Sequence, residues 1–200
     1  DATLVAISSG CICCTIRADL AGTLAKAPGR YARGGERWFD RVVIETTGIA
    51  DPAPILQTIL GDFAVSIRYS LASVVTTVDA LNGLESLRAH PEALKQVAVA
   101  DRIALTKTDL VTADQQQPLL GQLNSLAPSA PVIPVVAGAA DIDWFFDGRN
   151  YVLDGKHPDV ETWLGAERQF DAQASGHGQH GHSEISHDHD KHDHNRHDHN

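Results

Sequence analysis

The alternation of short apolar runs with segments of helical period constrains the fold of this chain more than any other feature. The runs are rich in β-branched residues and end in turn residues, which is typical of strands. They are Leu4–Ile7, Arg41–Ile44, Leu71–Val78, Arg102–Leu105 and Pro131–Val136. Runs that are apolar on both faces fit central parallel strands covered by helices. The alternation therefore predicts a doubly wound α/β fold with a mostly parallel sheet.

The segments between these runs predict the helices and the organisation of the chain. Candidate helices are Ile16–Lys26, Pro52–Leu60, Pro91–Ala100 and Ala113–Leu126. Asp51 is the expected N-cap before Pro52, and Thr112 the expected N-cap before Ala113. We expect a main α/β unit over residues 1–140. An edge segment or linker follows over 141–171, where Trp144–Phe146 and Val160–Leu164 can pack as short helices or flaps, and a disordered tail covers 172–200.

Composition and charge exclude some classes of partner. The chain has 200 residues, 42% of them hydrophobic, which is enough for one globular domain. Its net charge of −10 and the lack of a Lys/Arg stripe argue against nucleic acid as a partner. It has no apolar span of about 20 residues, which argues against a membrane. Because methionine is absent and Asp1 runs straight into an apolar stretch, we expect a piece of a longer protein, cut on its N-terminal side.

The cysteines lie together at Cys11, Cys13 and Cys14. Disulfide scaffolds use well-separated and usually even-numbered cysteines, so we expect free thiols in a reducing, cytoplasmic compartment. Three thiolates suit Zn(II) or Cu(I) and leave one tetrahedral position, whose ligand the sequence does not identify. The alternatives are that these cysteines fill the core or that Cys13 and Cys14 form a vicinal disulfide.

Two strand ends bear polar residues of chemical interest. Glu45 ends the run Arg41–Ile44, where a carboxylate can hold the water of a nucleotide's Mg²⁺, and Gly48 can bring its N–H close to a phosphate. Acids and glycines at strand ends are also common in any α/β protein. After the run Arg102–Leu105, the carboxylate of Asp109 can accept two hydrogen bonds from guanine, while the stem of Lys107 lies along the base. The alternative for this cluster is a helix cap.

In their order along the chain, these motifs closely resemble a known family. The segments are Cys11–Arg17, Glu45–Pro52, Val78–Ala80 and Gln96–Asp101 leading into Thr106–Asp109. Together they resemble the CobW-like metallochaperones of the CobW/HypB/UreG family of P-loop GTPases over roughly residues 1 to 137.

The resemblance implies a P-loop NTPase-like fold of the SIMIBI class and a GTPase that uses GTP and Mg²⁺. Such proteins couple GTP hydrolysis to delivery of a metal, often Zn²⁺ and here also considered as Co²⁺ or Ni²⁺, to a client metalloprotein. It assigns the cysteines to the metal site, Glu45 and Gly48 to the catalytic Walker B and switch II region, and Thr106, Lys107 and Asp109 to base recognition. The resemblance leaves open whether the protein forms a homodimer.

Two departures from the family pattern matter. Thr106 stands where the base motif usually has Asn, and a hydroxyl can replace only part of the amide's hydrogen bonding. The chain contains no G-x-x-x-x-G-K-[ST], the loop that cradles the phosphates. We expect this Walker A loop upstream of Asp1 and the family's C-terminal domain downstream, so the chain alone should bind nucleotide poorly and hydrolyse essentially none.

The tail is rich in histidines interleaved with Asp, Asn, Lys and Arg, in a pattern unlike a plain purification tag. They are His177, His180, His182, His187, His189, His192, His194, His197 and His199. Imidazole suits Zn, Ni, Co or Cu(II), so we expect a metal-collecting segment. His90 and His157 are expected to be ordinary surface residues. The alternatives to a GTPase are a metal-storage or buffering module and, less favoured, a thiol redox protein.

Overall fold

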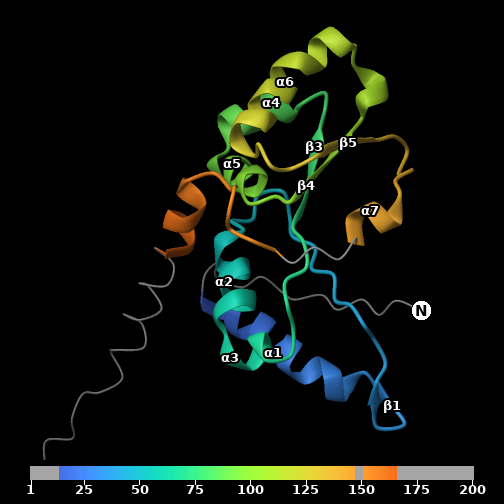
Figure 1. Cartoon of the computed structure of the whole chain (residues 1–200), viewed down its shortest axis with the longest axis vertical. Helices are drawn as coiled ribbons and strands as arrows, with labels where there is room; N and C mark the ends of the chain where they lie inside the picture. Colours follow the sequence, from blue (N-terminus) through green and yellow to red (C-terminus); the bar gives the residue numbers. More distant parts are fainter. Residues whose placement is uncertain (1–13, 147–150, 166–200) are drawn as a thin grey trace, which may run out of the picture.

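A three-stranded parallel sheet forms the centre of the molecule. The computed structural model describes residues 14–146 and 151–165 of the chain. The sheet has the order β3 (Val75–Asp79), β4 (Arg102–Thr106), β5 (Val132–Val135) (Figure 1). Parallel strands require crossover connections, and α4 (Gly83–Ala89), α5 (Pro91–Ala98) and α6 (Ala113–Leu126) supply them. The mostly parallel α/β architecture expected from the alternation is confirmed.

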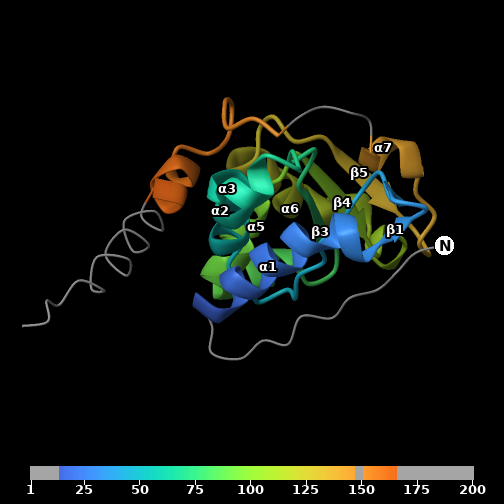
Figure 2. The ribbon, with the colours of Figure 1, turned by 90° about the horizontal axis from the view of Figure 1, so that it is seen from below.

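Three further helices form a second layer at the opposite end of the molecule from α6 (Figure 1), which Figure 2 shows from below. This layer contains α1 (Cys14–Arg30), α2 (Ala53–Gly61) and α3 (Phe63–Ser66), held by a small core of Leu20, Leu24 and Val65. After α1 the chain forms a short antiparallel hairpin of β1 (Ala32–Arg33) and β2 (Glu36–Arg37). Gly34 and Gly35 form its turn at φ of +62° and +87°, a region that side chains disfavour.

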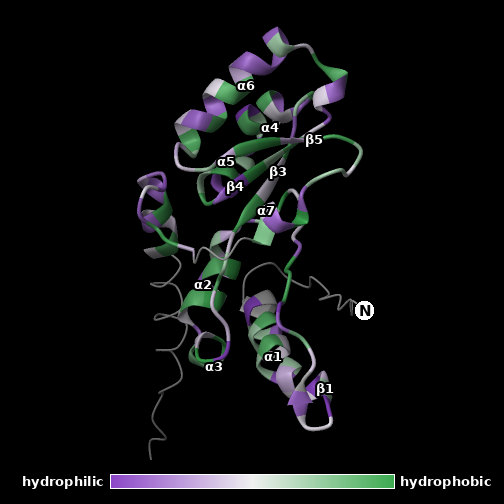
Figure 3. Cartoon of the chain, turned by 45° about the vertical axis from the view of Figure 1, so that its right-hand side comes forward, coloured by the Kyte–Doolittle hydropathy of each residue, from purple (hydrophilic) through white to green (hydrophobic). Residues whose placement is uncertain are grey.

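The main core lies between the sheet and helices α4, α5 and α6. Ile103, Leu119 and Leu123 are fully buried in it, and α6 accordingly shows mixed hydrophobic and hydrophilic positions along its length (Figure 3). Helix α6 begins as predicted, because Thr112 accepts from the Gln115 N–H and the Gln115 side chain accepts from the Thr112 N–H in a capping box.

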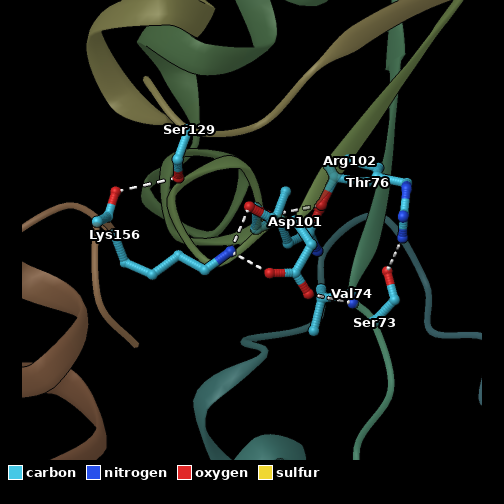
Figure 4. Close-up of polar contacts among 10 residues, drawn as sticks. Ser73, Val74, Thr76, Asp101, Arg102, Ser129 and Lys156 are labelled. Atoms are coloured by element: carbon cyan, nitrogen blue, oxygen red, sulfur yellow. Dashed lines mark hydrogen bonds and ion pairs between the residues drawn. The ribbon is translucent and has the colours of Figure 1, made fainter. Parts of the chain in front are cut away.

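The residues after the sheet pack back onto it. Helix α7 (Ile142–Phe146) forms where a short helix was expected, and residues 159–165 are also helical. Val160 and Leu164 are buried against α2 and the end of α5. The ammonium of Lys156 donates to Ala100 O at 2.6 Å and to Asp101 Oδ1 at 2.5 Å, and the Ser129 hydroxyl donates to Gly155 O at 3.1 Å (Figure 4). We refer to residues 151–165 as the C-terminal strap.

Several boundaries differ from expectation. Helix α1 extends from Cys14 to Arg30, and α5 ends at Ala98, where Val99 caps it. Pro52, not Asp51, is the N-cap of α2, although Asp51 Oδ1 still accepts from the Ala53 N–H at 2.9 Å. Helices α3 and α4 and the hairpin were not predicted, because each is too short to show a clear period.

The prediction of a strand at Arg41–Ile44 is wrong for this structure. The segment is extended but pairs with no described strand, and Val42, Val43 and Ile44 are 40%, 71% and 37% exposed. A strand needs a partner, and a groove separates this segment from β3, the nearest edge of the described sheet. Residues 71–74 likewise lack a described partner strand, so β3 begins at Val75 and not at Leu71. The predicted strand Leu4–Ile7 lies outside the described residues.

Candidate nucleotide and metal site

The loop after β4 has an unusual backbone at Lys107. Its φ of +57° lies in the left-handed region, which is uncommon for a residue with a side chain and costs conformational energy. The preceding residue, Thr106, is bound to β3 and the residue after it by two hydrogen bonds. Its hydroxyl donates to Val78 O at 3.2 Å, and its backbone oxygen accepts from the Ala80 N–H at 2.9 Å. The left-handed residue therefore projects from a fixed position at the carboxyl end of the sheet.

Asp79 holds the Lys107 side chain. The Lys107 ammonium donates to Asp79 Oδ2 at 2.6 Å, and Asp79 Oδ1 accepts from the Leu81 N–H at 2.8 Å and the Asn82 N–H at 3.3 Å. Desolvation would raise the pKa of Asp79, but the hydrogen bond from Lys107 and those from Leu81 and Asn82 outweigh it and lower the pKa to about 2. The carboxylate is thus ionised at neutral pH and orients the lysine.

Asp109 lies two residues farther on, in the short 3₁₀ turn η1 (Thr108–Leu110). It is exposed, and among the described residues its carboxylate accepts no hydrogen bond. The turn is held by the Gln116 amide, which donates to Thr108 O at 3.3 Å. Leu110 beside it is 60% exposed, and Leu81 on the β3–α4 connection is 54% exposed. The loop therefore offers an accessible carboxylate, a lysine stem and exposed apolar side chains, the groups that a planar base requires.

A groove of about 870 Å³ lies along the edge of β3 that pairs with no described strand. One wall is the extended segment 39–48, the other is residues 68–77, and α2 contributes Ile55, Leu56 and Ile59. Glu45 and Gly48 both line it. A methyl group at Gly48 would meet no described atom within 4 Å, so no described residue fills the space beside its backbone.

Two neighbouring residues of α5 hold the turn that follows Glu45. The Ala50 N–H donates to Thr47 O at 3.1 Å, which closes the turn, and the Gln96 amide donates to Ala50 O at 2.8 Å. The ammonium of Lys95 donates to Asp51 Oδ2. Gln96 and Asp79 lie inside motifs recognised in the sequence, but the sequence analysis gave neither of them a role. Their hydrogen bonds join segments about 30 to 50 positions apart, and such a bond leaves no local sequence pattern.

The structure brings only some of the predicted residues together. Thr106, Lys107 and Asp109 share one loop, while the described residues lining the groove around Glu45 and Gly48 include neither Lys107 nor Asp109. Cys11, Cys13 and the nine tail histidines, from His177 to His199, lie outside the described residues. Cys14 is the first residue of α1.

The lone histidines lie at ordinary positions. His90 is exposed at the start of α5, and His157 stacks on Trp163 with its Nδ1 3.6 Å from Asp159 Oδ2. Within residues 14–146 and 151–165, no three His, Cys, Asp or Glu side chains are grouped to hold a metal. In the same described ranges, no helix is long and apolar enough to cross a membrane.

Comparison with known proteins gives one consistent result. Residues 1–134 match the CobW/HypB/UreG nucleotide-binding domain. The chain is 36% identical over 148 residues to the zinc chaperone YjiA of Escherichia coli K12, covering 74% of this chain and 46% of YjiA. It is 33% identical over 138 residues to the zinc-regulated GTPase metalloprotein activator 1 of Schizosaccharomyces pombe, covering 68% of this chain and 32% of the relative.

Solved structures agree with this. The crystal structure of Zn(II)-bound YjiA GTPase from E. coli aligns with a TM-score of 0.55 and 34% identity, over 76% of this chain and 45% of that one. A Zn(II)-bound triple mutant of YjiA aligns with a TM-score of 0.52 and 38% identity, over 66% and 38%. These neighbours confirm the P-loop NTPase-like fold expected from the sequence. The chain spans less than half the length of these relatives.

Proposed function

Because the chain belongs to the CobW/HypB/UreG family of nucleotide-binding domains, we propose that it is the GTP-binding part of a metallochaperone that couples GTP hydrolysis to delivery of zinc to a client metalloprotein. Zinc is favoured over cobalt or nickel because the relatives are named as zinc chaperones or zinc-regulated activators. The client and the reaction are proposed for the whole protein, since the chain spans less than half the length of these relatives.

The observation that carries the proposal is the loop after β4. Asp109 presents an accessible carboxylate, and Lys107, whose backbone is left-handed, has its side chain held by an ion pair with Asp79. A carboxylate accepts two parallel hydrogen bonds from guanine N1–H and the 2-amino group, and adenine lacks this pair of donors. The Thr106 hydroxyl donates its one proton to Val78 O, which fixes the start of the loop against β3. The loop therefore favours GTP over ATP.

The groove offers a specific place for a phosphate loop. Its two walls are extended segments, no described strand pairs with the edge of β3 beside it, and apolar residues of α2 line it. A strand added there would pair with β3 and bury the exposed side chains of Val42 and Ile44. We assign this place to the strand that leads into the phosphate loop. Glu45 and Gly48 would then lie beside the phosphates, where the carboxylate can hold a water of Mg²⁺.

For the metal, we assign Cys11, Cys13 and Cys14 as the transferable zinc site. Thiolate donors select zinc from hard cations, and Cys14 leads directly into α1. Leu24 of that helix lines the groove, so α1 contacts the region where the phosphate loop is assigned. The histidine tail, from His177 to His199, is assigned as a collecting segment that raises the local zinc concentration.

The proposal is tested on the protein extended upstream to include a phosphate loop. Turnover of GTP and ATP is measured for the wild type, for Asp109→Asn and for Asp114→Asn, an exposed aspartate of α6 that serves as the matched control. We expect GTP turnover in the wild type and the control, and a loss of preference for GTP over ATP of about 100-fold or more in Asp109→Asn. Stoichiometric zinc without any binding of GTP would instead support the metal-storage alternative.

A further inference from the structure

Helix α5 contacts the turn that follows Glu45 through the side-chain amide of Gln96. Gln96 Nε2 donates to Ala50 O at 2.8 Å and lies 3.3 Å from Gly48 O and 3.4 Å from Thr47 O. The first contact is a normal hydrogen bond and the other two are long, as expected when one amide group faces three carbonyl groups. The three carbonyls belong to the turn that contains the proposed catalytic Gly48.

Gln96 is itself fixed to the sheet. Its own backbone oxygen accepts from the Thr76 hydroxyl at 2.6 Å, and Thr76 is a buried residue of β3. Gln96 thus connects β3, which lines one side of the groove, to the turn Thr47–Ala50 on the opposite side. Both hydrogen bonds are short and partly buried, so Gln96 ties the turn to the sheet.

The neighbouring residue adds a second contact. The Lys95 ammonium forms an ion pair with Asp51, just after the turn, and lies 5.8 Å from the centroid of the Trp163 ring in the C-terminal strap. Asp51 also accepts from the Ala53 N–H at the start of α2. Lys95 therefore fixes the exit of the turn where Gln96 fixes its middle.

We propose that Gln96, assisted by Lys95, is a positioning residue for the turn Thr47–Ala50 in GTP turnover, a role that rests on the proposed function. Helix α5 leads through residues 99–101 into β4, which ends in the base-recognition loop. The same rigid unit therefore connects the loop that reads the base with the turn that lies beside the phosphates. Loss of the Gln96 amide leaves the base loop intact and releases the turn.

The first test uses the chain as it stands and measures hydrogen exchange of the Ala50 N–H, which closes the turn. Gln96→Ala should speed this exchange about fivefold, the effect of losing one hydrogen bond. Gln96→Glu keeps the length of the side chain but cannot donate when ionised, so it should match or exceed the alanine variant. Gln96→Lys keeps a donor and should restore part of the protection. Gln122→Ala, at an exposed glutamine of α6, is the matched control and should leave the exchange unchanged.

The second test uses the protein extended upstream and measures GTP turnover. Gln96→Ala should lower kcat about fivefold or more with a KM for GTP within twofold of the wild type, because the base loop is untouched. Lys95→Met should act in the same direction, and Gln122→Ala should change neither constant. A merely structural role would lower the melting temperature and raise KM as well.

The outcomes separate this inference from the function on which it rests. Faster exchange together with a lower kcat supports it. Exchange equal to that of Gln122→Ala overturns it, and so does faster exchange with an unchanged kcat. If the wild-type protein hydrolyses no GTP, the proposed function fails, and so does the positioning role of Gln96 in turnover, while the exchange data still show whether its amide holds the turn.

Discussion

Replacing Lys156 with methionine tests whether the C-terminal strap is part of the folded domain. The side chain of Lys156 is only 4% exposed, and its ammonium donates to Ala100 O and to Asp101 Oδ1 (Figure 4). Methionine retains most of the apolar stem and removes both hydrogen bonds. Asp101 keeps one described partner, the Val74 N–H at 2.8 Å from its Oδ2.

The expected loss follows from these contacts. A hydrogen bond to a charged group contributes about 1.5–3 kcal/mol, and removing one partner of a buried ion pair costs about 3–5 kcal/mol. Asp101 is 20% exposed, so water replaces part of what it loses, and we expect a loss of about 2–4 kcal/mol. For a domain of this size that lowers the melting temperature by about 4–16 °C.

The assay is urea unfolding of the whole chain, followed by circular dichroism, with Lys26→Met as the matched control. Lys26 lies on an exposed position of α1, where a substitution should change stability by less than about 0.5 kcal/mol. In a double-mutant cycle with Asp101→Asn, the coupling energy should be about 1–3 kcal/mol. A Lys156→Met variant as stable as the control would refute the conclusion that the strap is held by a buried ion pair.

Three further predictions concern other parts of the chain. The Asp79 carboxyl has a folded pKa of about 2, below its unfolded value, so its ion pair with Lys107 stabilises the protein above pH 4 and is lost as the pH falls through 2. In unfolding measured as a function of pH, the free energies of unfolding of the wild type and Asp79→Asn should differ by about 1 kcal/mol near pH 6, after solvent screening. The two values should converge as the pH falls to 2. In Gly83→Ala the new methyl group lies 2.8 Å from Val78 Cγ1, so urea unfolding should show a loss of about 1–3 kcal/mol, and an unchanged midpoint would mean that the helix shifts freely. Removing residues 177–200 should reduce the number of zinc ions bound per chain, measured by metal analysis after dialysis, and an unchanged stoichiometry would exclude the tail as a zinc ligand.

The parts of the fold that the sequence predicted well are those fixed by local physics. Helix α6 and its cap at Thr112 follow from a capping box and a helical period, and β4 is an apolar run of the right length. The segment Arg41–Ile44 has the same strand composition, yet it does not pair, because pairing depends on a neighbouring strand that the described residues do not provide. Composition predicts the tendency to form a strand, and the partner decides whether the strand forms.

The residues of the candidate site also fall into those that the sequence identified and those that only the structure revealed. Lys107 and Asp109 were recognisable because base recognition uses consecutive residues of one loop. The contribution of Asp79 to that loop, and of Gln96 to the turn at Gly48, depends on segments 28 and 48 positions apart in sequence. Both residues lie within the motifs that showed the family resemblance, and their physical role became visible only with the hydrogen bonds.

Coupling of GTP hydrolysis to zinc delivery requires that the nucleotide state of the intact protein changes its affinity for zinc. The most direct measurement is a zinc-competition titration of the protein extended upstream, carried out with a non-hydrolysable GTP analogue, with GDP and without nucleotide. Coupling between two sites is typically 1–3 kcal/mol, so we predict zinc affinities that differ at least fivefold between the GTP-analogue and GDP states. Affinities that agree within twofold in all three states, in a protein that binds both zinc and GTP, would contradict the account.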